Sequence, residues 1–417
     1  MSTLPLSLRA RGLRPSPTLA ITARAKQLRA EGQTICVLSA GEPDFDTPAF
    51  IRRAASEAME RGATRYGPAA GEPPLRQAIA RKLSEENGIA TEPAQVLVTN
   101  GGKQALFNLF QVLLDPGEEV LLPAPYWVSY PEMVRLAGGS VRLLPCEPGN
   151  GFLLEPEQLE AAIGPSTRAL VINSPGNPTG TVLGRERLEA IAEVLRRHPR
   201  VVLICDEIYE HLLAEGERHH SLLALAPDLQ ERGFLVNGFA KSWAMTGWRI
   251  GYLSGPAHAI AASVALQSQS TSNVCTFAQY GALAALQGGR EEMAAMVAAY
   301  NERRDLLSSG LQAIPGVSLQ PPRGAFYAFP DISGFALSSL EFSRRLLEEQ
   351  GLAVVPGEAF GDDRCIRLSC AAEPSAIRDG LERLGRFIDS LRNGALQAAA
   401  PSAMVSGMSS TRPSPQP

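Results

Sequence analysis

Short apolar runs alternate with helix-like stretches through most of the chain. Five of the runs are apolar at successive positions rather than at every second one, a pattern typical of strands buried on both faces. They span residues 95–99, 119–123, 168–173, 201–206 and 233–237, and a sixth predicted strand spans 140–144. Because helical periodicity fills most of the intervals, the pattern predicts an α/β fold with a parallel sheet covered by helices on both sides.

Helices are predicted where apolar residues recur with the helical period. The predicted helices span 18–31, 49–61, 73–87, 103–114, 184–197 and 290–313. The pattern then changes to a mixture of helices and strands over 317–385, which indicates a second, α+β domain. The segment after about residue 394 is small, polar and rich in Pro and Ser. Such a composition cannot bury a core, so it predicts a disordered tail.

Charge and hydropathy exclude several classes of protein. The 417 residues include 39 basic and 43 acidic side chains, and the net charge of −4 argues against a nucleic-acid-binding protein and against a polybasic membrane-surface protein. No run approaches the ~18 apolar residues of a transmembrane helix. No apolar stretch follows the N-terminal arginines, as it would in a secretory signal. We therefore expect neither nucleic acid nor a membrane as a partner.

The cysteines and histidines suggest neither a disulfide framework nor a metal centre. Six cysteines occur without a Cys-x-x-Cys pair, and several lie in strand-like apolar runs. This pattern predicts reduced, buried thiols in a cytoplasmic protein. The five histidines lack the spacing of metal ligands, and the adjacent His219 and His220 would point apart on a regular element. We expect no metal site.

Lysine is scarce, since the 39 basic residues comprise 35 Arg and only four Lys. Lys26 and Lys82 occupy polar positions of predicted helices, and we expect both at the surface. Lys103 and Lys241 each follow a predicted strand, at the strand-to-helix turns where doubly wound α/β folds bind their ligands. These two are therefore the candidates for chemistry that requires an amine.

The turn before the first of these lysines is rich in glycine. It reads Asn100-Gly101-Gly102-Lys103 and opens a predicted helix. Free backbone N–H groups and the helix dipole make such a turn an anion site, although a plain glycine-rich turn has the same sequence. Dinucleotide and P-loop sites are excluded. No G-x-G-x-x-G opens a helix after a strand, and Leu97 stands where a Walker A loop requires glycine.

Further polar residues follow the other predicted strands. Asp206 ends one strand and Tyr209 follows it, Asn177 follows another, and Lys241 follows a third with Arg249 eight residues later. In a parallel sheet these strand ends converge on one edge. A lone aspartate at such a place is often a helix cap. The combination of carboxylate, phenol, amide, lysine and arginine instead predicts a functional site.

These residues resemble the signature of the class I pyridoxal-phosphate aminotransferases of fold type I. Within that family, the sequence is similar to those of the bacterial aspartate aminotransferases. The resemblance runs over about residues 12–392. Its stretches are AGEPDFDTP (40–48), TRYGPAAG (64–71), GGKQALFNLFQ (101–111), PYWVSYPEM (125–133), DEIYEHL (206–212), AMTGWRIGY (244–252) and CIRLSCA (365–371). It implies a large domain with a mostly parallel seven-stranded sheet and a smaller α+β domain. The expected division is an N-terminal arm and part of the small domain (1–48), the large cofactor-binding domain (49–310), the small C-terminal domain (311–393) and the tail (394–417).

The resemblance also implies pyridoxal 5′-phosphate as the cofactor and gives roles to residues. Lys241 would form the Schiff base with it and then act as the general base, Asp206 would keep the pyridine nitrogen protonated, and Tyr209 would hydrogen-bond the ring 3-oxygen. Other contacts to the cofactor would come from Gly101, Gly102, Lys103, Trp127, Asn177, Arg249 and, across a homodimer interface, Tyr66. Contacts to the substrate would come from Gly41, Trp127, Asn177, Arg367 and Lys103.

Two departures from the family pattern concern the phosphate and the substrate. Gly238 stands where the family often has a Ser that contacts the phosphate, so backbone would have to replace that hydroxyl. No Arg lies between residues 249 and 290 to bind the substrate's distal carboxylate, and the similar bacterial enzymes use the lysine of Gly-Gly-Lys instead. Lys103 is therefore the candidate for that carboxylate, with Ser16 and Thr18 nearby. The alternative is that Lys103 only supports the phosphate.

We predict an aspartate aminotransferase that transfers the amino group of L-aspartate to 2-oxoglutarate in a ping-pong mechanism, giving oxaloacetate and L-glutamate. It would be a homodimer with shared active sites. One alternative is dual specificity for aspartate and prephenate, where Lys103 and Arg14 could serve the larger substrate. Another is a class I aminotransferase of broader amino-acid range. A carbon–sulfur lyase would use the same cofactor for a different reaction. A cofactor-binding regulator would have no catalytic activity, but such a regulator would need a DNA-binding helix pair, and none precedes the fold.

Overall fold

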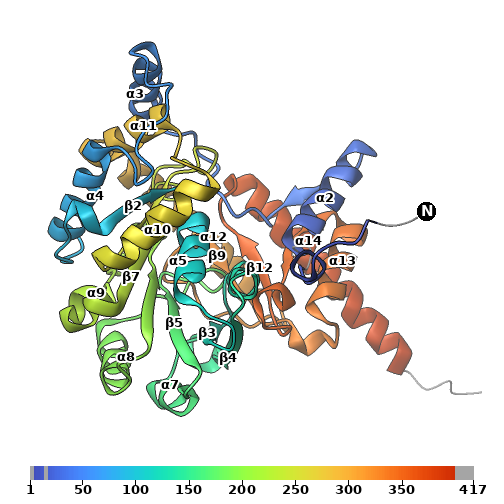
Figure 1. The fold of residues 1–417 in the computed structure, drawn as a ribbon. Helices are drawn as coiled ribbons and strands as arrows, with labels where there is room; N and C mark the ends of the chain where they lie inside the picture. Colours follow the sequence, from blue (N-terminus) through green and yellow to red (C-terminus); the bar gives the residue numbers. More distant parts are fainter. Residues whose placement is uncertain (1–3, 14–16, 400–417) are drawn as a thin grey trace, which may run out of the picture.

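A seven-stranded sheet forms the centre of the larger part of the molecule (Figure 1). The computed structural model describes residues 4–13 and 17–399. Across the sheet the strand order is β2 (Val96–Thr99), β8 (Gly251–Ser254), β7 (Gly233–Gly238), β6 (Val202–Asp206), β5 (Thr167–Asn173), β3 (Glu119–Ala124) and β4 (Ser140–Pro145). The pairs from β7 to β4 are parallel, whereas β8 is antiparallel to both β2 and β7. The predicted mostly parallel sheet is confirmed.

Helices cover both faces of this sheet because alternate residues of each strand point to opposite faces and both sets are apolar. In β6, Val202 and Ile204 pack against one helix layer, whereas Leu203 and Cys205 pack against the other. The first layer consists of α5 (Gly102–Leu113), α6 (Tyr130–Leu136) and α10 (Ala257–Ser270). The second consists of α4 (Pro73–Glu85), α7 (Pro156–Ala162), α8 (Arg185–Arg197), α9 (Leu222–Leu225) and α11 (Thr276–Gln287), with α3 (Ala49–Glu60) against α11.

The smaller part combines the N-terminal segment with the C-terminal quarter of the chain (Figure 1). Cys36 and Leu38 share a core with residues of the last helices, which explains why the N-terminal segment packs there. Its helices are α1 (Leu8–Arg11), α2 (Pro17–Ala30), α13 (Ser339–Gln350) and α14 (Pro374–Ala399), and α12 (Arg290–Gln312) packs against them. Its strands are β1 (Cys36–Val37) paired with β10 (Leu352–Ala353), and β11 (Val355–Pro356), β12 (Ile366–Ser369) and β9 (Tyr327–Ala328) in one sheet.

The structure differs from the sequence-based expectation at two places. Strand β8 was not predicted, because it has four residues and lies between glycine-rich stretches. Because β8 lies between β2 and β7, β2 pairs with this antiparallel strand and not with a parallel neighbour. The last helix continues to Ala399, beyond the expected start of the tail at 394, and the remainder of the tail lies outside the described residues. Within the described residues, no helix combines the length and the apolar character that crossing a bilayer requires.

Candidate active site

A cavity of about 620 Å³ lies where the carboxyl ends of the parallel strands face the small domain. Strand β6 ends at Asp206, and Arg367 belongs to β12 of the small domain. Nine of the predicted site residues line the cavity: Gly41, Gly102, Lys103, Trp127, Asn177, Asp206, Tyr209, Lys241 and Arg367. The structure therefore brings together residues from both domains that sequence reasoning had assigned to one site.

Asp206 is buried at the base of the cavity and is held by a tyrosine. The Tyr130 hydroxyl donates a hydrogen bond of 2.6 Å to Asp206 Oδ2, and the Ile208 N–H donates one of 3.3 Å to Oδ1. Burial raises the pKa of Asp206 to about 6, although these two donors oppose the rise. Sequence reasoning missed Tyr130, which lies three residues after Trp127 and meets its ring edge-on.

Tyr209 is held by a second tyrosine that sequence reasoning also missed. Its hydroxyl lies 2.9 Å from the Tyr327 hydroxyl, which comes from β9 of the small domain. Burial raises the pKa of Tyr209 well above its ordinary value. Both phenols are therefore neutral at physiological pH, so each can donate one hydrogen bond and still accept another.

Arg367 is buried, with 3% of its surface exposed, and its guanidinium is only partly satisfied. One Nη donates to Asn177 Oδ1 at 3.0 Å and the other to the Ser39 carbonyl at 3.0 Å. Among the described residues, its Nε has no hydrogen-bond acceptor. The ring of Tyr327 lies 4.4 Å from the guanidinium carbon. A buried guanidinium that lines a cavity suits a carboxylate ligand.

Lys241 lies beside these groups with its amine directed across the cavity. Its Nζ donates to the Gly41 carbonyl at 2.5 Å and lies 5.7 Å from the centre of the Tyr209 ring. Burial and the charges of Arg367 and Arg249 together lower the pKa of Lys241 to about 8, although Glu42 and Asp206 oppose the shift. The amine therefore loses its proton far more readily than an ordinary lysine and is available as a nucleophile or base.

The glycine turn before α5 has the geometry of a phosphate cradle. Gly101 adopts a φ of +80°, and a Cβ at this position would lie 2.7 Å from Arg249 Nη2. Arg249 reaches over the turn, donating to the carbonyls of Thr246 at 2.8 Å and Asn100 at 3.2 Å. The first N–H groups of α5 point out of the helix end, since they have no partner inside the helix. These donors fit the phosphate of the expected cofactor.

The glycine at position 238 has a steric explanation. Gly238 pairs with Gly251 of the neighbouring strand β8, and a Cβ at Gly238 would lie 2.8 Å from the Gly251 Cα. Gly251 is equally confined, since its Cβ would lie 2.6 Å from the Gly102 nitrogen. The close approach of these backbones leaves no room for the serine that the family pattern often has there.

Lys103 extends into the cavity from the first turn of α5. Its Nζ lies 5.1 Å from the centre of the Trp127 ring. Burial lowers the pKa of Lys103, and the Arg249 charge lowers it further. The ammonium thus faces the wall formed by Trp127, while Arg249 covers the glycine turn. Lys103 thus places its positive charge in the cavity, whereas Arg249 places its charge over the glycine turn.

The contributions of four further residues stay predictions. Tyr66 has 91% of its surface exposed, so its expected contact across a dimer interface stays a prediction. Arg14 and Ser16 lie outside the described residues. Thr18 belongs to α2, but its side chain is not among those described.

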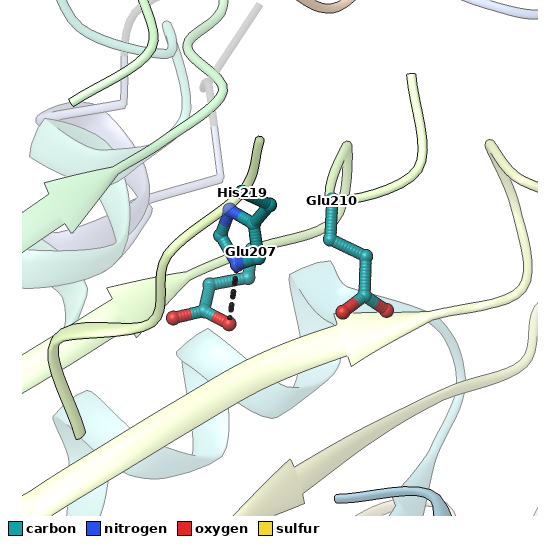
Figure 2. Close-up of side chains that lie close together, drawn as sticks. All are labelled: Glu207, Glu210 and His219. Carbon is teal, nitrogen blue, oxygen red and sulfur yellow. Dashed lines mark hydrogen bonds and ion pairs between the residues drawn. The ribbon is translucent and has the colours of Figure 1, made fainter. Parts of the chain in front are cut away.

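A second polar cluster lies behind the turn that carries Asp206. One ligand atom each of Glu207, Glu210 and His219 lie within 4.8 Å of one another (Figure 2). His219 Nε2 is 3.0 Å from Glu207 Oε2, and the Ser221 hydroxyl donates to Glu207 Oε1 at 2.6 Å. Burial lowers the pKa of His219, but the Glu207 carboxylate more than compensates and the net shift is upward. The Glu207 carboxylate is thus already hydrogen-bonded by a histidine ring and a hydroxyl.

Lys82 completes this cluster and corrects an expectation. It was predicted at the surface, but only 8% of it is exposed and its ammonium forms an ion pair with Glu210. The polar pattern of α4 did not reveal this because the partner lies 128 positions away. The Lys82 ammonium already donates to Glu210 Oε1. Glu207, Glu210 and His219 therefore belong to a cluster that contains a buried ion pair.

Comparison with known proteins agrees with this geometry. Residues 33–384 match the family model described as aminotransferase class I and II. The chain is 48% identical over 386 residues to the aspartate/prephenate aminotransferase of Thermus thermophilus, covering 92% of this chain and 98% of that protein. It is 45% identical over 389 residues to the aspartate aminotransferase of Geobacillus stearothermophilus, covering 92% and 99%. A solved structure of the Thermus thermophilus aspartate aminotransferase with maleate has a TM-score of 0.88 at 47% identity, covering 92% of this chain and 100% of that one.

A further solved structure, the aspartate aminotransferase from Rhizobium meliloti, has a TM-score of 0.90 at 40% identity and covers 93% of this chain. The family match includes Gly41 near its start and Arg367 near its end, and so spans both domains that form the cavity. The predicted family, fold and enzyme class are confirmed. The chain belongs to the class I and II aminotransferases, which are pyridoxal-phosphate-dependent enzymes.

Proposed function

We propose that this enzyme transfers the amino group of L-aspartate to 2-oxoglutarate. The observation that carries the proposal is the pair of cations in one cavity, Arg367 and Lys103, beside the reactive amine of Lys241. Aspartate and 2-oxoglutarate each carry two carboxylates. A site with one cation for each carboxylate favours such substrates over amino acids with neutral side chains.

Pyridoxal phosphate, when bound, supplies an aldehyde that accepts the amino group and a ring that withdraws electrons from the substrate Cα. Asp206 would hold the proton on the pyridine nitrogen, and its burial keeps that ion pair away from water. Tyr209 and Asn177 would donate to the ring 3-oxygen. Trp127 would stack on the ring, while Gly101, Gly102, the backbone of Lys103 and Arg249 would hold the phosphate. Lys241 would bind the aldehyde carbon.

The protein's own groups then perform the proton transfer. Arg367 would hold the α-carboxylate through its guanidinium, helped by the backbone at Gly41, since both residues line the cavity. Lys241 Nζ would take the proton from the substrate Cα and return it to the cofactor carbon. Its lowered pKa suits this exchange near neutral pH. Closure of the small domain would exclude water from the cavity during these steps.

We also propose that the enzyme works as a homodimer. Tyr66 is exposed in this chain although the family pattern places the equivalent tyrosine on the phosphate of a neighbouring site. Its position supports a composite site in which each subunit lends Tyr66 to its partner. A cytoplasmic location, predicted from the free thiols, stays part of this proposal.

The decisive experiment compares amino donors with 2-oxoglutarate as acceptor for the wild type and Lys103→Ala. We expect the substitution to lower kcat/KM for aspartate by about 100-fold, the value of one charge-assisted contact, and to change kcat/KM for alanine by less than threefold. In a ping-pong mechanism, kcat/KM for the donor does not include the half-reaction with 2-oxoglutarate, which also needs Lys103. Lys26→Ala removes an exposed lysine and is the matched control. Equal loss for all donors would show that Lys103 serves only the phosphate. A colourless protein that takes up no pyridoxal phosphate would refute the proposal as a whole.

A second candidate activity is the transamination of prephenate. The relative from Thermus thermophilus carries the name aspartate/prephenate aminotransferase, and prephenate, like 2-oxoglutarate, carries two carboxylates for the two cations of the cavity. Lys103 would then bind the carboxylate on the ring of prephenate. Parallel kinetics with oxaloacetate and prephenate as acceptors test this activity, and turnover of oxaloacetate alone would exclude it.

A further inference from the structure

The turn that carries Asp206 and Tyr209 has two faces with different surroundings. Asp206 and Tyr209 line the cavity, whereas Glu207 and Glu210 point into the polar cluster behind it (Figure 2). Both glutamates are buried. Burying a carboxylate is costly unless its charge is paired and its oxygens accept hydrogen bonds. The groups that pair with Glu210 therefore help to fix the position of the turn.

Glu210 is bound by residues from two other elements. Its Oε1 accepts from Lys82 of α4 and from Asn237 of β7, the latter at 2.8 Å. Its Oε2 accepts from Asn87, which follows α4, at 2.7 Å, and Lys82 donates to Asn87 Oδ1 at 2.7 Å. Burial alone would raise the pKa of Glu210, but the Lys82 charge lowers it well below its ordinary value. Lys82 therefore keeps Glu210 ionised and able to accept all three bonds.

The same turn is bonded to the chain on both sides of Lys241. Asn237 precedes Lys241 by four residues and donates to Glu210. Ser242 directly follows Lys241, and its hydroxyl lies 2.9 Å from His211 Nδ1. Burial lowers the pKa of His211, so the imidazole is neutral at physiological pH and Lys82 is the cation that pairs with Glu210. Two contacts from one turn thus bracket the reactive lysine.

We propose that Lys82 is a positioning residue. By pairing with Glu210, it fixes the turn of Asp206 and Tyr209 relative to the segment of Lys241, and so sets the mutual placement of the three groups that hold and react with the cofactor. This inference rests on the proposed function, which gives those three groups their roles. A displacement of about 1 Å among reacting groups can lower a rate by about 100-fold, so a residue that touches no ligand can control the chemistry.

The test uses the holoenzyme and three variants. Lys82→Met keeps the length of the side chain and removes its charge. The double variant Lys82→Met/Glu210→Gln removes both charges and leaves an amide oxygen that can accept from Asn237. Leu83→Ala removes a fully buried side chain of the same helix without changing any charge, and so is the control for loss of stability alone. Each is measured for the midpoint pH of the cofactor's visible absorption change, for kcat and KM with aspartate, and for melting temperature.

We expect Lys82→Met to move the absorption midpoint by about 0.5 pH unit or more and to lower kcat by about tenfold or more, with a smaller change in KM. The double variant is expected to recover most of both losses. Leu83→Ala is expected to lower the melting temperature while the absorption midpoint and kcat stay at their wild-type values. A Lys82→Met variant that behaves like Leu83→Ala, or a double variant no better than the single one, would overturn the inference.

Lys82→Met leaves a buried carboxylate without its partner, which carries a risk of misfolding. If it does not fold, Asn237→Ala decides, because it removes the bond by which Glu210, paired with Lys82, reaches the lysine segment, without leaving a charge unpaired. We expect it to move the absorption midpoint in the folded holoenzyme, and an unchanged midpoint would overturn the inference. A wild-type protein that binds no pyridoxal phosphate would refute the proposed function itself. A coloured, active wild type with unresponsive variants would refute only the role of Lys82.

Discussion

The hydrogen bond from Tyr130 to Asp206 makes a quantitative prediction for the cofactor-free protein. Tyr130→Phe removes the 2.6 Å donor and leaves only the longer bond from the Ile208 N–H. A hydrogen bond to a charged group is worth about 1.5–3 kcal/mol, and 1.36 kcal/mol corresponds to one pKa unit. The variant should therefore raise the pKa of Asp206 from about 6 to between roughly 7 and 8.

The sign of the effect on stability follows from linkage. The folded-state pKa of Asp206 is raised above its unfolded value, so this group favours the folded protein most at low pH and less as the pH rises through the folded pKa. At about pH 4 the carboxyl is protonated in the folded state of both proteins, so wild type and variant should differ little. Above about pH 8 the variant should be less stable by about 1.5–3 kcal/mol.

Denaturant unfolding of the cofactor-free proteins between pH 4 and pH 8.5 measures this difference directly. Tyr280→Phe on α11, away from the cavity wall, is the control for loss of a phenol hydroxyl. A difference between Tyr130→Phe and wild type that stays constant over this pH range would refute the reasoning, because the hydroxyl would then not act on the Asp206 charge. In the holoenzyme the same substitution should lower kcat by roughly tenfold to 100-fold.

Two further predictions concern the cradle and the reactive amine. Gly101→Ala should weaken pyridoxal phosphate binding by at least about tenfold, because the added Cβ meets Arg249. The control Gly117→Ala has a similar positive φ but open space around the added Cβ, and it should leave the affinity unchanged. A fluorescence titration of cofactor binding compares the two variants. In the cofactor-free protein, modification of Lys241 by an amine reagent should show a midpoint near pH 8, and succinate should raise it by neutralising Arg367. A midpoint unaffected by saturating succinate would contradict this coupling.

The residues that could be predicted from the sequence are those whose signal is local. Asp206 and Lys241 each end or follow an apolar run, and the parallel sheet places such strand ends on one edge. The glycine at 101 could be predicted for the same reason, because it opens a helix directly after a strand. Local pattern and sheet topology were sufficient to predict that Asp206, Tyr209 and Lys241 meet at one edge of the sheet, whereas Trp127 and Arg367 came from the family resemblance.

The partners that hold these residues could not be predicted, because their contacts are distant along the chain. Tyr130 lies 76 positions from Asp206, and Tyr327 lies 118 positions from Tyr209. In its own segment, each of these tyrosines has the pattern of an ordinary core aromatic residue. A ring can be buried without a specific partner, so the local sequence does not reveal the hydrogen bond of the hydroxyl. The pattern of a single helix shows which positions are polar, but not which buried charge on another element will pair with Lys82.

The distribution of charge connects substrate binding to proton transfer. In the ligand-free cavity, the unpaired charge of Arg367 adds to burial in lowering the pKa of Lys241. A carboxylate seated on Arg367 would cancel that contribution, so the freed amine would become a stronger base once the substrate is in place. Arginine suits this role because it stays protonated even when buried, whereas a lysine at position 367 could lose its proton and the coupling with it. The two cations are thus not interchangeable: one must keep its charge and the other must be able to give it up.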